Sequence, residues 1–182
     1  MLKGGEGGWE PATTLWELWD SDSQGPSMNS RNHIMFGTVS AWFYRKLLGV
    51  TPLTPGYTKV AIKPTGSNYA NLTHAAARVA TPQGDVAVSV KYNSSTFEVN
   101  VTLPIGTTAL VSVPLHTSVA GLTATPPAHI ITEGAAPVWR QGAFSPGVAG
   151  VQAARLSADR AHVEVEVVFG SYHFVSTRVH RV

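Results

Sequence analysis

The segment "AHVEVEVVFGSYHFVSTR" near the C-terminus alternates apolar and polar residues. Val163, Val165 and Val167 fall on one side of an extended chain, while Glu164 and Glu166 fall on the other. A period of two predicts a strand with one buried face and one wet face, which is typical of antiparallel sheets. The feature therefore restricts this part of the chain to a layered β structure, in which a second layer covers the apolar face.

Three further stretches extend this pattern over the middle of the chain, and the second of them comprises three short strands. They are "TKVAIKP", "THAAARVATPQGDVAVSVKYNSSTFEVNVTLP" and "TTALVSVPL", with turns expected at residues 82–84 and 93–95. Residues 117–150 are rich in Pro, Ala and Gly, and a looser structure is expected there. Several short strands at close spacing predict a mainly β fold, an antiparallel β-sandwich over residues 53–182.

Residues 32–48, "NHIMFGTVSAWFYRKLL", carry a different period. Their apolar residues recur at a spacing of three and four, which predicts one helix with a broad buried face. Asn29 or Ser30 is expected to cap its start, and Gly49 to end it. The Pro- and Gly-rich "TPLTPGY" follows, so we place a domain boundary between residues 1–52 and 53–182.

Composition excludes several classes of function. Charged residues make up 13% of the chain, the net charge is +2, and Lys and Arg form no run, so a nucleic-acid partner is not expected. The chain has no cysteine, which excludes disulfides and thiolate metal sites. No apolar stretch is long enough to span a membrane, and "MLKGGEGGWE" lacks the apolar core of a signal peptide. The compartment stays open, as does glycosylation of the three sequons at Asn71, Asn93 and Asn100.

The stretch "TTLWELWDSD" places Glu17 between Trp16 and Trp19. A carboxylate beside apolar rings is desolvated and suits proton transfer, and indole faces stack on sugar rings. A structural glutamate that caps a turn or pairs with Arg31 is the alternative. His33 can contact an anion or hydroxyl at the helix start, or it can be satisfied by a backbone carbonyl. The remaining histidines show no ligand spacing, so neither a metal nor a cofactor is expected.

Two of these stretches resemble a known family. "ATTLWELWD", followed by "MNSRNHIMFGTVSAWFYRKLLGVTPLTPGYTKVAIKP", is similar to bacterial-type α-L-rhamnosidases of glycoside hydrolase family 78. The resemblance continues more weakly through "TPQGDVAVSV" and the closing "FGSYHF" of the β part. It implies that residues 1–52 are the C-terminal remnant of an (α/α)6 catalytic barrel, with the helix as its last member.

The resemblance also implies roles for particular residues. Glu17 would be the general base of an inverting α-L-rhamnosidase and would deprotonate the attacking water. Trp16 and Trp19 would line the rhamnose pocket, and His33 and Asn32 would contact or support it. Leu18 stands where the family usually carries Arg, which would alter a neighbouring ion pair.

An inverting glycosidase also needs a general acid, about 6.5–9.5 Å from the base. In this family that acid lies on earlier barrel helices, so the isolated chain is expected to be inactive alone. The resemblance implies a rhamnose-containing glycoside as the ligand, and it allows an N-terminal barrel chain as a protein partner. The alternatives are a stand-alone rhamnose-binding module and a purely structural β-sandwich.

Overall fold

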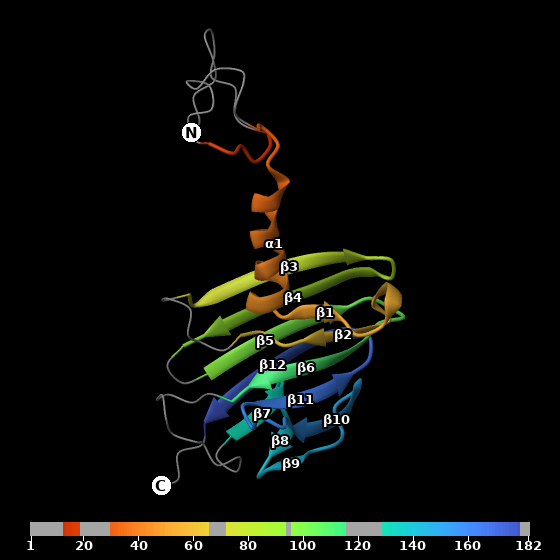
Figure 1. The fold of residues 1–182 in the computed structure, drawn as a ribbon. Helices are drawn as coiled ribbons and strands as arrows, with labels where there is room; N and C mark the ends of the chain where they lie inside the picture. Colours follow the sequence, from red (N-terminus) through yellow and green to blue (C-terminus); the bar gives the residue numbers. More distant parts are fainter. Residues whose placement is uncertain (1–12, 19–29, 66–71, 94–95, 116–128, 179–182) are drawn as a thin grey trace. The chain divides into compact units, whose positions relative to one another are not determined.

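The computed structural model describes residues 13–18, 30–65, 72–93, 96–115 and 129–178. The chain divides into two compact units, residues 1–43 and 44–182. Figure 1 traces both along the sequence. Within the described residues, no helix has the length and apolar character that crossing a membrane requires.

The described residues of the second unit form two β-sheets, whose strands are labelled in Figure 1. The first has the order β1 (Val50–Pro52), β2 (Lys59–Ile62), β6 (Thr108–Pro114), β11 (His162–Val167) and β10 (Val151–Leu156). The second has the order β3 (His74–Thr81), β4 (Gly84–Tyr92), β5 (Thr96–Leu103), β12 (Gly170–Arg178), β7 (His129–Glu133), β8 (Ala136–Arg140) and β9 (Ala143–Phe144). All pairings are antiparallel except β2 with β6. The predicted mainly β sandwich is confirmed.

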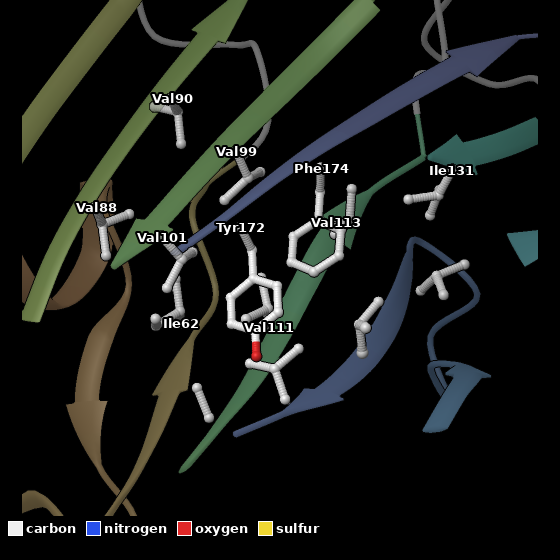
Figure 2. Packing of buried hydrophobic residues seen from close by; sticks show 14 of the residues in the cluster. Ile62, Val88, Val90, Val99, Val101, Val111, Val113, Ile131, Tyr172 and Phe174 are labelled. Atoms are coloured by element: carbon white, nitrogen blue, oxygen red, sulfur yellow. The ribbon is translucent and has the colours of Figure 1, made fainter. Parts of the chain in front are cut away.

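The apolar faces of the two sheets meet in one core. Figure 2 shows side chains of β4, β5 and β12 pointing toward those of β6. Val99, Val111 and Phe174 are completely buried, and burial of each such side chain stabilises the fold by about 1.5–3 kcal/mol. The expected wet face of β11 is also present, because Arg155 on β10 binds Glu164 and Glu166 at 2.9 Å each.

Part of the β structure departs from the expectation. The stretch predicted to be loose contains β7, β8 and β9, and neither β1 nor β10 was predicted. Each of these strands is short or irregular: β8 contains Pro137, and both β7 and β10 have a register shift. Such strands are held by pairing and packing with their neighbours, so their own side-chain period is weak.

The predicted helix is present but is not uniform. It begins as the 3-10 turn η2 (Ile34–Gly37), continues as α1 (Thr38–Trp42) and ends as the π-type turn η3 (Phe43–Leu47). His33 occupies the cap position without a side-chain hydrogen bond, so the expected cap at Ser30 is wrong, and Asn29 lies outside the described residues. Gly49 does end it, with a φ of +71°, and a Cβ there would lie 1.9 Å from the Lys63 carbonyl oxygen.

The helix does not bury the apolar face predicted for it. Large apolar side chains from η2 to η3 are exposed: Ile34, Met35, Phe36, Val39, Trp42, Phe43 and Tyr44. Only Leu47, at the end of η3, is buried. In the part of the chain that the structure describes, the first unit has no second layer of helices against which this face could pack.

The strand β1 bears on the boundary that we placed after residue 52. Its residues pair with β2, and Val50 is part of the sandwich core. The two compact units divide between Phe43 and Tyr44. The domain boundary itself stays a prediction about which residues descend from the barrel.

Candidate functional site

The two segments of the first unit that carry the predicted site lie side by side. The Glu17 backbone N–H donates to the Ser30 carbonyl at 2.8 Å, and the His33 N–H donates to the Leu15 carbonyl at 2.6 Å. The Thr14 hydroxyl also donates to the Arg31 carbonyl. These bonds tie residues 14–17 to residues 30–33, and they bring the side chains of Glu17 and His33 to the same place.

The Glu17 carboxylate is held by a backbone group and faces an imidazole. Its Oε2 accepts a hydrogen bond from the Ser30 N–H at 3.0 Å and lies 4.0 Å from His33 Nδ1. The side chain of Glu17 is 39% exposed and that of His33 is 28% exposed. The expected desolvation of Glu17 is therefore not found among the described residues, because one backbone bond holds it while the carboxylate still reaches water.

Trp16 is half-buried, and a cation lies on its ring. The Arg31 guanidinium carbon is 4.9 Å from the ring centroid of Trp16. Such a contact contributes about 0.5–1 kcal/mol at an exposed site. Arg31 thereby lies over one face of the indole. The His33 ring in turn lies 5.0 Å from that of Phe36.

The structure brings three of the predicted site residues into one region, whereas the other two do not join them among the described residues. Glu17, Trp16 and His33 belong to one small region. Asn32 is exposed, and its backbone N–H bonds the Ser30 hydroxyl at 3.2 Å. Trp19 lies outside the described residues. Sequence reasoning missed Ser30, because its contribution is a backbone N–H that no side-chain pattern reveals.

A second polar cluster lies in the turn between β10 and β11. The Ser157 hydroxyl donates to Asp159 at 2.5 Å, and His162 Nδ1 lies 3.6 Å from the same carboxylate oxygen. In a serine nucleophile site the imidazole lies between hydroxyl and carboxylate, whereas here the carboxylate lies between the other two. The cluster thus fastens a turn. No group of three metal-ligating side chains occurs among the described residues.

Comparison with known families covers both parts of the chain. Residues 9–47 match the bacterial alpha-L-rhamnosidase 6 hairpin glycosidase domain, and residues 49–123 match the bacterial alpha-L-rhamnosidase C-terminal domain. Over these residues the chain belongs to the bacterial α-L-rhamnosidase family. The resemblance in "ATTLWELWD" and the residues after it is thereby confirmed.

Curated relatives of the chain are themselves α-L-rhamnosidases. The chain is 41% identical over 117 residues to the one from Alteromonas sp. (strain LOR), an alignment that covers 62% of this chain. It is 36% identical over 108 residues to the one from Streptomyces avermitilis, which covers 57% of this chain. These alignments span 12% and 10% of the two relatives, so the chain corresponds to about a tenth of their length.

Solved structures show the same relationship. An α-L-rhamnosidase from Dictyoglumus thermophilum aligns with a TM-score of 0.67 and 30% identity, over 91% of this chain and 16% of that one. The Streptomyces avermitilis α-L-rhamnosidase complexed with L-rhamnose aligns with a TM-score of 0.60 and 30% identity, over 90% of this chain and 14% of that one. The family relationship thus extends through both units of the chain.

Proposed function

We propose that Glu17 is the water-activating base of an inverting α-L-rhamnosidase site. In this proposal, the general acid comes from a part of the hairpin domain beyond residues 9–47. The observation that carries the proposal is the Glu17 carboxylate itself. It is fixed by the Ser30 N–H, lies 4.0 Å from His33 Nδ1 and is 39% exposed, in a segment that matches the glycosidase domain.

In this proposal each of the site residues has a defined role in the hydrolysis. Glu17 accepts a proton from a water molecule as the water oxygen bonds to the anomeric carbon of a terminal α-L-rhamnoside. The bond from that carbon to the leaving oxygen breaks, and the acid protonates the leaving oxygen, which gives β-L-rhamnose with inverted configuration. His33 orients Glu17 and contacts the sugar. Asn32 supports that loop, and Trp16 and Trp19 offer ring faces to the sugar.

A chimera tests this proposal. Residues 9–182 replace the matching segment of the Streptomyces avermitilis enzyme, which supplies the rest of its hairpin domain. The chimera is expected to hydrolyse an aryl α-L-rhamnoside, with β-L-rhamnose as the first product by NMR. Glu17→Gln should lower kcat at least about 100-fold, because a general base contributes 10²- to 10⁴-fold. The 182-residue chain alone should give no turnover.

The chain offers a matched control for that variant. The Glu98 carboxylate on β5 lies 3.4 Å from His173 Nε2, and its side chain is 31% exposed, so it is another partly exposed glutamate beside a histidine. Glu98→Gln in the chimera should leave kcat unchanged. An active chimera in which Glu17→Gln and Glu98→Gln behave alike would exclude Glu17 as the base.

A stand-alone rhamnose-binding module is the second candidate. It is favoured by the half-buried Trp16 ring in the same small region as the exposed Glu17 carboxylate and the half-buried His33 imidazole. Titration of the 182-residue chain with L-rhamnose, followed by tryptophan fluorescence, tests it. Saturable binding that is lost in Trp16→Ala would support the module, and an unchanged spectrum would leave the sandwich with a structural role.

A further inference from the structure

Among the described residues of the second unit, four strands lie at sheet edges, and three of them carry features that discourage pairing with another chain. β1 has three residues and includes Pro52, and β9 has only two residues. β10 has a register shift between Val151 and Ala153. Shortness, proline and bulges are the usual means by which edge strands avoid association.

β3 is the exception among these edges. It pairs with β4 through eight consecutive residues without a shift, and it contains neither Lys nor Pro. Arg78 is its one side chain with a permanent positive charge, and the Arg78 guanidinium already donates a hydrogen bond to Asp85 on β4 at 3.0 Å. The strand "HAAARVAT" is therefore long, regular and mostly of small side chains, which allows another backbone to approach closely.

The register tells which backbone groups of β3 point away from β4. The Tyr92 N–H bonds the Thr73 carbonyl, so odd-numbered residues of this segment face β4. The N–H and C=O groups of the even-numbered residues consequently point to the open edge. These residues are His74, Ala76, Arg78 and Ala80, and their side chains are exposed.

We propose that β3 pairs antiparallel with β3 of a second copy of this chain, about a two-fold axis at Ala77. Opposite residues of such a pair must lie on the same face, so each even residue must face an even one. An axis at Ala77 sets Ala76 opposite Arg78 and His74 opposite Ala80. An axis at Arg78 would set two guanidinium groups against each other, which is unfavourable.

This pairing also covers apolar surface. Ala75, Ala77 and Val79 are only partly buried, and they pack against the core beside the open edge. In the pair, Ala75 of one copy lies next to Val79 of the other. One strand per copy buries less than a standard interface, so the dimer is weak and depends on concentration.

Two substitutions at one exposed position test the pairing by analytical ultracentrifugation. Ala76→Lys would face Arg78 of the other copy, and Ala76→Glu would bond it. Because the two-fold axis creates this pair twice, the dimer dissociation constant should rise about threefold to thirtyfold for Lys and fall by a similar factor for Glu. Neither side chain disturbs the core, and equal unfolding curves for the two variants verify this.

Amide hydrogen exchange of the unmodified chain supplies a second measurement. At concentrations where nine-tenths of the chain is dimeric, the even amides of 76, 78 and 80 should exchange about tenfold more slowly than in dilute solution. The odd amides should not change with concentration. A chain that stays monomeric at 19.3 kDa, or one whose association ignores residue 76, would overturn the proposal. The second result would assign association to another surface, such as the exposed helix.

Discussion

Tyr172 shows how one side chain fastens the turn before β12. Its hydroxyl donates to the Val168 carbonyl at 3.0 Å, and the ring is almost fully buried. Tyr172→Phe should lower the free energy of unfolding by about 1 kcal/mol, the usual net contribution of one hydrogen bond. Urea denaturation of the chain measures this change.

Gly150 provides a second variant that depends on the same hydroxyl. A Cβ at Gly150 would lie 2.1 Å from the Tyr172 hydroxyl oxygen, and its φ is +79°, so Gly150→Ala should be strongly destabilising. In the Tyr172→Phe background the closest clash is absent, and the cost of Gly150→Ala should be smaller. Additive changes in the double-mutant cycle would contradict this contact.

Asp159 makes the stability of the β10–β11 turn depend on pH. Hydrogen bonds from the Ser157 hydroxyl and the Ala161 N–H hold the pKa of Asp159 well below its ordinary value of 3.8. A carboxyl whose folded pKa is lowered stabilises the fold above the unfolded pKa, and this contribution is lost as the pH falls below about 4. Burial lowers the pKa of the His162 imidazole below its ordinary value of 6.5. The unfolded chain therefore binds this proton more readily, and the free energy of unfolding begins to fall once the pH drops below about 6.5.

The variant Asp159→Asn separates these two groups. Its unfolding midpoint should be lower than that of the unmodified chain at neutral pH, and its dependence on pH should flatten below about pH 4. The change that His162 causes at higher pH should remain. Asp85→Asn removes another half-exposed carboxylate and is the control. Parallel curves for Asp159→Asn and the unmodified chain would refute the role of Asp159.

At the residue scale, the sequence also predicted part of the candidate site. It paired Glu17 with Trp16 and His33, because a motif fixes which side chains occur together. It did not reach the Ser30 N–H that holds the carboxylate or the Arg31 guanidinium on Trp16. Both contacts depend on how two loops run past each other, and this path leaves no periodic signal.

At the scale of elements, the spacing of apolar residues predicted strands best where one face is buried and the residues alternate regularly. The alternation in β11 is real, with Val163, Val165 and Val167 buried and Glu164 and Glu166 bonded to Arg155 outside. β7 to β9 were missed because pairing, rather than their own residues, holds them in the sheet. The parallel pairing of β2 with β6 was also beyond prediction, since it depends on the path of the chain between them.

The helix from η2 to η3 was predicted from the spacing of its apolar residues, but the face expected to be buried is exposed in the described part of the chain. Ile34 is 76% exposed and Val39 is 54% exposed, although their spacing is that of a buried face. Exposed apolar patches of this kind promote association. Ile34→Lys with Val39→Lys should therefore reduce binding of a hydrophobic dye by the chain and raise its solubility.

A core substitution provides the contrast for that pair. Ile131 on β7 is completely buried, so Ile131→Ala should lower the free energy of unfolding by about 2–5 kcal/mol. The double lysine variant should leave the main unfolding transition unchanged. A lower transition in the lysine variant would show that these helix side chains contribute to the main unfolding transition, and it would contradict the prediction.

At the scale of the whole molecule, the two units differ in the core that their described residues form. Every residue of the buried core cluster lies between Leu48 and Phe174, so the sandwich has its own core. The described residues of the first unit contribute none of these core residues, and most of this unit lies in the segment that matches the hairpin glycosidase domain. Among the described residues, the packing expected of a domain core therefore lies in the second unit.

This difference predicts the outcome of a truncation. Deletion of residues 1–43 should leave the main thermal transition within a few degrees of that of the full chain, because the core of the second unit stays intact. The product should also be more soluble, since it lacks most of the exposed apolar helix. Calorimetry measures the transition, and a deletion to residue 62, which removes β1 and β2, is the control that should not fold. A large drop in the transition of the first truncation would mean that the sandwich depends on the N-terminal unit for its stability.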